Sequence, residues 1–100
     1  MTLHPMKRVT VVCEAYARTP VTELVTSVGA HGWTVFAVEG SGHQGSRPGD
    51  IPEFENVQFE VIVPPAVAET LMTRLQAELF PNFAMVAYES DIRVLRRDKF

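Results

Sequence analysis

The sequence predicts an α+β fold in which two β-α-β units share one four-stranded antiparallel sheet. Two short runs, Lys7–Ala15 and Val57–Val63, alternate apolar and polar residues, which is typical of half-buried strands, and two further apolar runs, Trp33–Glu39 and Ala84–Leu95, are also expected to be strands. Two longer segments repeat apolar residues at helical spacing. Along the 100 residues the order is strand, helix, strand, strand, helix, strand. This is the ferredoxin-like βαββαβ arrangement, in a single domain that covers residues 1–100.

The first β-α-β unit lies in the first 39 residues. Its first strand is expected over Lys7–Ala15, where β-branched residues alternate with polar ones. A helix follows, with Thr19 as its expected N-cap and with Gly29 and Gly32 as the residues that end it. The second strand is expected over Trp33–Glu39.

The second unit begins with the most regular alternation in the chain, Val57–Val63 (VQFEVIV). Pro64 and Pro65 end this strand and open the second helix, because proline is tolerated in a first helical turn. The last strand is expected over Ala84–Leu95. Both helices should cover one face of the sheet. The other face should carry Val12, Phe36, Val38, Ile62 and Met85, and self-association would bury it.

A long loop, Gly40–Asn56 (GSGHQGSRPGDIPEFEN), separates the two units and holds four of the six glycines. Loops of this length are uncommon in small domains and are usually functional or disordered. Its glycines, hydroxyls and Arg47 would suit a phosphate, because backbone N–H groups and guanidinium groups both bind anions. A flexible hairpin loop without a ligand is the alternative.

Composition excludes several classes of protein. The net charge of −3 and the pI near 5.5 argue against nucleic-acid binding, which depends on basic surface. The single cysteine, Cys13, cannot form an internal disulfide and is expected to be a small buried residue. No apolar run is long enough for a membrane span, and the N-terminal residues are not those of a signal peptide. We expect a cytoplasmic protein.

Metal binding and catalysis have little support in the sequence. The soft ligands are Cys13, His4, His31 and His43, and no two of them stand at a metal-binding spacing. His31 is expected to interact with the end of the first helix rather than to act as a base. No nucleophile with an adjacent base is evident. We therefore expect neither a metal site nor an enzyme, and no cofactor.

The run Gly32-Trp33-Thr34-Val35, the Gly40-x-Gly42 turn and the strand at Val57–Val61 together resemble the PII signalling superfamily. More closely, they resemble its PII-like branch linked to bicarbonate uptake and carboxysomes. The resemblance implies a homotrimer whose sheets face inward. It also implies that ADP, AMP or cyclic AMP binds in clefts between subunits, and that the long loop (the T-loop) engages a target protein such as a transporter or carboxysome component.

The resemblance also implies which residues bind the nucleotide. Thr34 and the Gly40–Gly42 turn match nucleotide-contacting positions, and Ser46 and Arg47 match phosphate-side positions of the loop. Arg93 and Arg97 are expected to reach the cleft from a neighbouring subunit; a solvated basic tail is the alternative. The full expected set is Thr34, Gly40, Ser41, Gly42, His43, Ser46, Arg47, Tyr88, Arg93 and Arg97.

One segment departs from the nitrogen-sensing members of the superfamily. Their second helix is followed by a loop that carries glycine and lysine and holds the triphosphate, whereas here the link is Phe80-Pro81-Asn82-Phe83. The sequence therefore predicts a trimeric regulator that binds ADP or AMP and senses inorganic carbon as bicarbonate. The alternatives are a cation-binding trimer of similar fold and a small enzyme that uses the sheet cleft.

Overall fold

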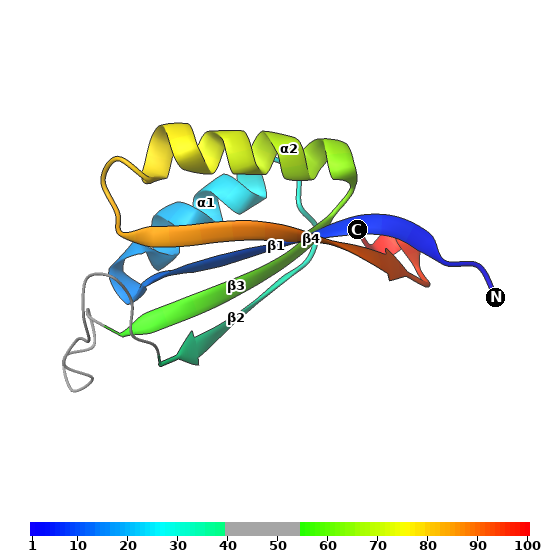
Figure 1. Cartoon of the computed structure of the whole chain (residues 1–100), viewed down its shortest axis with the longest axis horizontal. Coiled ribbons are helices and arrows are strands. Elements are labelled where there is room, and N and C mark those ends of the chain that lie inside the picture. Colours follow the sequence, from blue (N-terminus) through cyan, green and yellow to red (C-terminus); the bar gives the residue numbers. More distant parts are fainter. Residues whose placement is uncertain (40–54) are drawn as a thin grey trace.

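In a computed structural model the chain forms a four-stranded antiparallel sheet with two helices on one face (Figure 1). The structure describes residues 1–39 and 55–100. The strands are β1 (His4–Glu14), β2 (Trp33–Val38), β3 (Asn56–Val63) and β4 (Met85–Val94), in the sheet order β2-β3-β1-β4. The helices are α1 (Arg18–Ser27) and α2 (Pro65–Arg74). The predicted ferredoxin-like fold is thus confirmed.

Short helical turns extend or connect these elements. A 3-10 turn, η1 (Ala15–Ala17), joins β1 to α1, and α2 continues as a π-helical turn, η3 (Leu75–Leu79). The wider turn is closed by a hydrogen bond from the Phe80 N–H to the Leu75 carbonyl, 3.0 Å long. After β4 the chain forms a last 3-10 turn, η4 (Arg97–Lys99).

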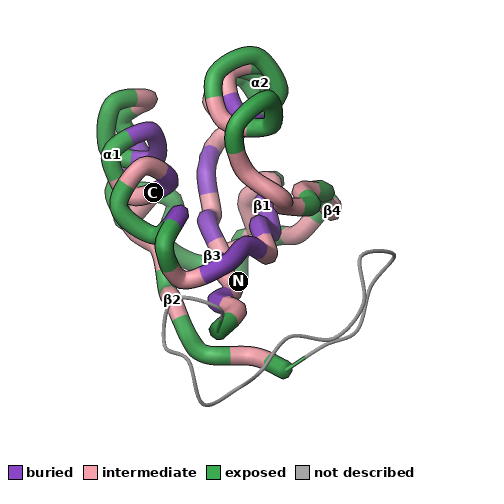
Figure 2. Tube along the Cα trace, turned by 90° about the vertical axis from the view of Figure 1, so that its left-hand side faces the viewer, coloured by how far each residue is buried: buried purple, intermediate pink, exposed green. Residues whose placement is uncertain are grey.

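The core lies between the sheet and the helices, as the alternation predicts (Figure 2). All four apolar residues predicted for the inner face of β3 (Val57, Phe59, Val61 and Val63) are buried. They pack with Val9, Val11 and Cys13 of β1 and with the buried stripes of the helices. One prediction for the opposite face is wrong. Met85 pairs with Cys13 in the ladder and packs against the core, because it lies on the helix side of β4.

The first helix differs from the prediction at its start and agrees with it at its end. It begins at Arg18, one residue before Thr19, because η1 runs directly into it; the N-cap is Ala17, without a side-chain hydrogen bond. Gly29 has a φ of 88° and ends the helix as predicted. The Gly29 N–H donates to Thr26 and the Ala30 N–H to Val25, which is the hydrogen-bond pattern of a Schellman motif.

The expected boundaries of the long loop shift slightly. Asn56 pairs with Glu14 and Val38 and therefore belongs to β3. Residues 40–54 lie outside the described residues, so the site residues expected there (Gly40, Ser41, Gly42, His43, Ser46 and Arg47) stay predictions. Among the described residues, no helix is long and apolar enough to cross a membrane.

Candidate functional site

The sheet face away from the helices, called the open face below, carries two of the expected site residues. Thr34 of β2 pairs with Glu60 of β3, Glu60 with Thr10 of β1, and Thr10 with Tyr88 of β4. These four residues form one row across the whole sheet. Thr34 and Tyr88 stand at its two ends, about 14 Å apart at the usual strand spacing. The structure therefore does not bring them together around one small ligand within a protomer.

The middle of this row is a hydrogen-bonded cluster around Glu60. The Thr10 hydroxyl donates to Oε2 of Glu60 at 3.0 Å, and the Gln58 amide donates to Oε1 at 2.6 Å. Arg8 Nε lies 3.6 Å from Oε2. Thr10 is 2% exposed although no helix covers this face. Because both carboxylate oxygens accept hydrogen bonds, Glu60 links side chains of β1 and β3 at the centre of the face.

Apolar side chains surround this cluster. Three of them are large and exposed: Phe36 at 42%, Val86 at 56% and Tyr88 at 53%. Val12, Val38 and Ile62 are half-buried on the same face, as the sequence predicts. A sheet face of this kind is typical of a surface that another molecule covers.

The segment after β4 brings basic residues to the β2 side of the sheet. The ring of Phe100 lies over Gly32, where a Cβ atom would be 3.9 Å from Cε1 of the ring. Gly32 stands two residues before Thr34. The views agree that the end marked C lies beside the start of β2, away from β4 in Figure 2. Arg97, an expected site residue, belongs to the turn that directly precedes Phe100.

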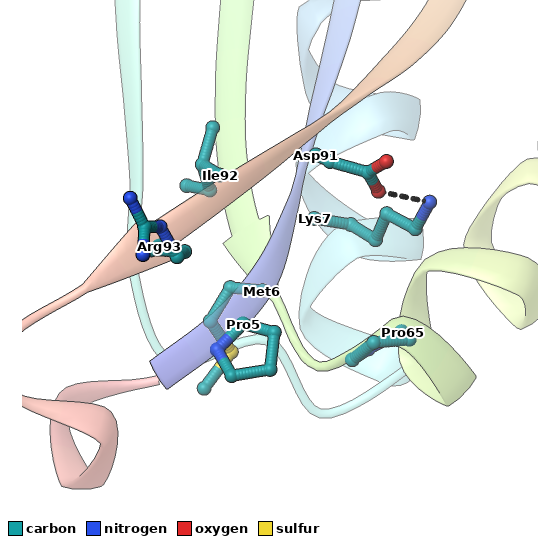
Figure 3. Close-up of a pocket in the computed structure, with 7 residues that line it drawn as sticks. All are labelled: Pro5, Met6, Lys7, Pro65, Asp91, Ile92 and Arg93. Atoms are coloured by element: carbon teal, nitrogen blue, oxygen red, sulfur yellow. Dashed lines mark hydrogen bonds and ion pairs between the residues drawn. The ribbon is translucent and has the colours of Figure 1, made fainter. Parts of the chain in front are cut away.

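Arg93 lies elsewhere, on the edge strand β4, where it pairs with Pro5 of β1. It lines a shallow hollow of about 400 Å³ together with Lys7, Pro65 and Asp91 (Figure 3). Lys7 Nζ donates a 2.5 Å hydrogen bond to Asp91, which raises the pKa of Lys7, and lies 3.6 Å from Glu89. Since β4 and β2 are opposite edges of the sheet, Arg93 and Thr34 of one protomer do not share a site.

Glu39 and Glu55, the described residues on either side of the long loop, lie at the opposite end of the sheet from Phe100. There the Ala15 N–H donates to the Glu55 carbonyl at 2.6 Å. Tyr16 packs against Phe83 of the α2–β4 link, with ring centroids 5.5 Å apart. Figure 1 shows this link, the end of β2 and the start of β3 gathered at one end of the molecule, together with the turn η1 that follows β1. The α2–β4 link, which has no glycine and no lysine, is thus held in part by this contact between two aromatic rings.

Outside the open face, the described residues include one buried thiol and one ion pair between the two helical turns of α2 and η3. Cys13 is buried, and desolvation, with a smaller contribution from Glu14, raises the pKa of its thiol to about 11. In the described part of the chain no three His, Cys, Asp or Glu residues are grouped as metal ligands would be. Arg74 and Glu78 form an exposed ion pair on α2 and η3, and the hydrogen bond from Arg74 lowers the pKa of Glu78.

Sequence reasoning missed two features of this site. The Glu60 cluster joins residues 50 positions apart in the sequence, and its only signal was a pair of polar residues in the regular β3 alternation. The contact of Phe100 with Gly32 had no signal beyond a glycine before a strand, because nothing local indicates where the last residues lie.

Fold and site together define a ferredoxin-like α+β protein whose sheet has one uncovered face with exposed apolar side chains around the Glu60 cluster. The model of the family "Nitrogen regulatory protein P-II" matches residues 6–99. The chain belongs to this family, and it is a PII-like regulatory protein.

Solved structures agree with this assignment. A protein from Thermus thermophilus assigned to PII-like signalling is 38% identical, with a TM-score of 0.87, over 100% of this chain and 99% of its own. The structure of CPII from Thiomonas intermedia bound to ADP and bicarbonate is 25% identical, with a TM-score of 0.88, over 99% and 97%. CPII bound to ADP, AMP and bicarbonate matches at 24% identity and a TM-score of 0.90, over 99% and 96%. No curated protein matches.

Proposed function

We propose that this protein forms a homotrimer that binds ADP or AMP between subunits and responds to bicarbonate. The observation that carries the proposal is the row across the open face. Thr34 and Tyr88 stand at opposite edges of one sheet, so a single nucleotide can contact both only where two protomers meet. The structural match to CPII with ADP and bicarbonate supports the choice of ligands.

The proposed site needs cations to balance the phosphates. ADP carries two to three negative charges, and the protein itself has a net charge of −3. We assign this role to Arg47 of the loop and to Arg97, with the backbone N–H groups of Gly40–Gly42 and the hydroxyl of Ser46 as further donors. Ligand contacts that differ between two loop conformations would then alter how the loop meets a target protein.

The first test is nucleotide choice, measured by isothermal titration calorimetry. The α2–β4 link has no lysine, and Phe83 of this link is packed against Tyr16. We therefore expect ADP and AMP to bind at least as tightly as ATP, and bicarbonate to change the affinity for ADP. A strong preference for Mg-ATP, or no binding of any adenine nucleotide, would contradict the proposal.

The second test is Arg47→Ala. A charge-assisted hydrogen bond contributes about 1.5–3 kcal/mol, and about 1.4 kcal/mol corresponds to a factor of ten. We expect this variant to bind ADP about tenfold more weakly, with its thermal stability unchanged. Equal affinity of the variant and the wild type would remove Arg47 from the site.

A further inference from the structure

We propose that Arg8 forms an ion pair with Glu60 of the partner subunit when the open faces assemble, and that this pair makes the protein select copies of itself. The inference rests on the proposed function, since it takes the homotrimer as given. It deepens that function by naming the contact through which one protomer recognises the next. In a single protomer the two side chains lie next to one another at the centre of the open face.

Arg8 lies on the open face because it stands two residues before Thr10 in β1, and alternate residues of a strand face the same side. Its ladder partners are Ile62 of β3 and Ser90 of β4. The Arg8 side chain is 48% exposed and that of Glu60 is 24% exposed. Any molecule that covers this face therefore removes a guanidinium group and a carboxylate group from water together.

Within one protomer, both charged groups keep unused hydrogen-bonding capacity. Nε of Arg8 lies 3.6 Å from Oε2 of Glu60, which is longer than a hydrogen bond. Within residues 1–39 and 55–100, the other two nitrogens of this guanidinium group form no ion pair. Each oxygen of the Glu60 carboxylate accepts one side-chain hydrogen bond, whereas the group can accept about four in all. Donors therefore remain on Arg8 and acceptors on Glu60.

Assembly makes this unused capacity costly. A charge that is taken out of water without a partner is strongly unfavourable, and the exposed side chains of Phe36 and Val86 make the rest of this face apolar. The remaining donors of Arg8 must then meet an acceptor of the molecule that covers the face. A second copy of this chain supplies one, because its own open face carries the Glu60 carboxylate with acceptor sites to spare.

The acidic residues of β4 face the other side of the sheet. Glu89 and Asp91 lie 3.6 and 2.5 Å from Nζ of Lys7. Lys7 alternates with Arg8 along β1, and its pair with Asp91 lies on the side of the sheet that α2 covers (Figure 3). Of the acidic residues in β3 and β4, Glu60 alone thus faces the open side, which makes it the partner for Arg8.

A closed ring of three protomers suits such a pair. In a threefold ring each protomer presents one patch to the next protomer and a different patch to the previous one. Arg8 of each protomer then reaches Glu60 of the next, and the same ion pair occurs at all three interfaces. A foreign protein without a carboxylate at this place would leave Arg8 unpaired, which disfavours the wrong partner.

The first experiment exchanges the two charges in the double variant Arg8→Glu/Glu60→Arg. Copies of this variant can pair with one another, but contact with the wild type would bring together two carboxylates or two guanidinium groups, and like charges across an interface are costly. We expect each protein to form trimers by itself. When the two are co-expressed with tags of different mass, native mass spectrometry should find almost no mixed trimers.

The matched control is Arg74→Glu/Glu78→Arg, which exchanges an exposed ion pair of α2 and η3 away from the open face. This variant should mix with the wild type at random, so that mixed trimers make up about three quarters of the total. Random mixing of the Arg8→Glu/Glu60→Arg variant would overturn the inference, because a pair that acts only within a protomer does not affect which copies assemble.

The second experiment decides the matter even if the charge-exchanged variant forms no trimer. Arg8→Gln keeps a polar side chain but removes the charge, which leaves the Glu60 carboxylate of the partner subunit without its cation. We expect the protein concentration at which half of the chains are assembled to rise about tenfold or more in sedimentation experiments. Arg74→Gln should leave this concentration unchanged. Wild-type assembly of Arg8→Gln would overturn the inference.

Failure of the inference and failure of the proposed function give different results. A wild-type protein that remains a monomer would overturn the proposed homotrimer and the inference together. A wild-type trimer that binds ADP but mixes freely with the charge-exchanged variant would overturn the inference alone.

Discussion

At the scale of single residues, burial lowers the reactivity of the Cys13 thiol. Its side chain is 2% exposed among the buried residues of β1 and β3, and desolvation raises the pKa of the thiol to about 11. Because the thiolate is the reactive form, a native protein at pH 8 should hold only roughly a thousandth of this cysteine as thiolate. The sequence-based expectation of a small buried residue is confirmed.

We predict that Cys13 reacts with a thiol reagent only after unfolding, which is readily measured because it is the only cysteine. The same pKa predicts a loss of stability at high pH. Between about pH 9 and 11 the unfolded thiol has lost a proton that the folded state retains, so the free energy of unfolding falls as pH rises. Cys13→Ala should flatten this slope in denaturant titrations. Rapid labelling of the native protein at pH 8 would contradict the assignment.

At the scale of elements, the end of α1 is decided by one glycine. Gly29 has a φ of 88°, a conformation that side chains rarely adopt, although a Cβ atom there would meet nothing within 4 Å. A side chain at position 29 would therefore be strained by the backbone conformation and not by contacts with neighbouring atoms. Gly32, three residues later, has no positive φ and offers a matched comparison.

We predict that Gly29→Ala lowers the free energy of unfolding by about 1 kcal/mol or more, because alanine disfavours the left-handed region that the Schellman motif needs. Gly32→Ala should be neutral or stabilising by a few tenths of a kcal/mol, since it reduces the entropy of the unfolded chain. Urea unfolding of both variants measures the difference. Equal stability of the two would mean that α1 can end without the motif.

At the scale of the whole molecule, the two faces of the sheet differ in what covers them. The helix side is a closed core, whereas the open face exposes Phe36, Val86 and Tyr88 around the Glu60 cluster. A trimer that packs these faces inward would bury both the apolar side chains and the hydrogen-bonded cluster. Assembly and nucleotide binding would then depend on the same surface, since Thr34 and Tyr88 are part of it.

We predict that Phe36→Asp converts a trimer to monomers at micromolar concentration in sedimentation experiments, because it places a charge on a surface that assembly would desolvate. Phe80→Asp is the matched control: Phe80 is similarly exposed, at 38% against 42% for Phe36, but it lies beyond the end of η3. Both variants should remain folded, since neither residue is in the core. A wild-type monomer, or a Phe36→Asp trimer, would exclude the open face as the interface.

The sequence by itself determined the elements, their order and the buried face of each strand except β4. Val57–Val63 illustrates why: with a period of two, Val57, Phe59, Val61 and Val63 lie on one side of the strand, and all four are buried when that side faces the helices. The motif at Gly32-Trp33-Thr34 likewise identified the family, which the family match over residues 6–99 confirms. The strand pattern follows from local physical chemistry, whereas the family followed from the resemblance of this motif to known sequences.

Only the tertiary structure decided which of these residues meet. The sheet order β2-β3-β1-β4 separates Thr34 from Tyr88 and from Arg93, and it assembles the Glu60 cluster from strands far apart in the sequence. The side of β4 on which Met85 lies depends on its register against β1, where a shift of one residue exchanges the two faces. The position of Phe100 on Gly32 is decided by packing between residues 68 positions apart, for which no local pattern exists.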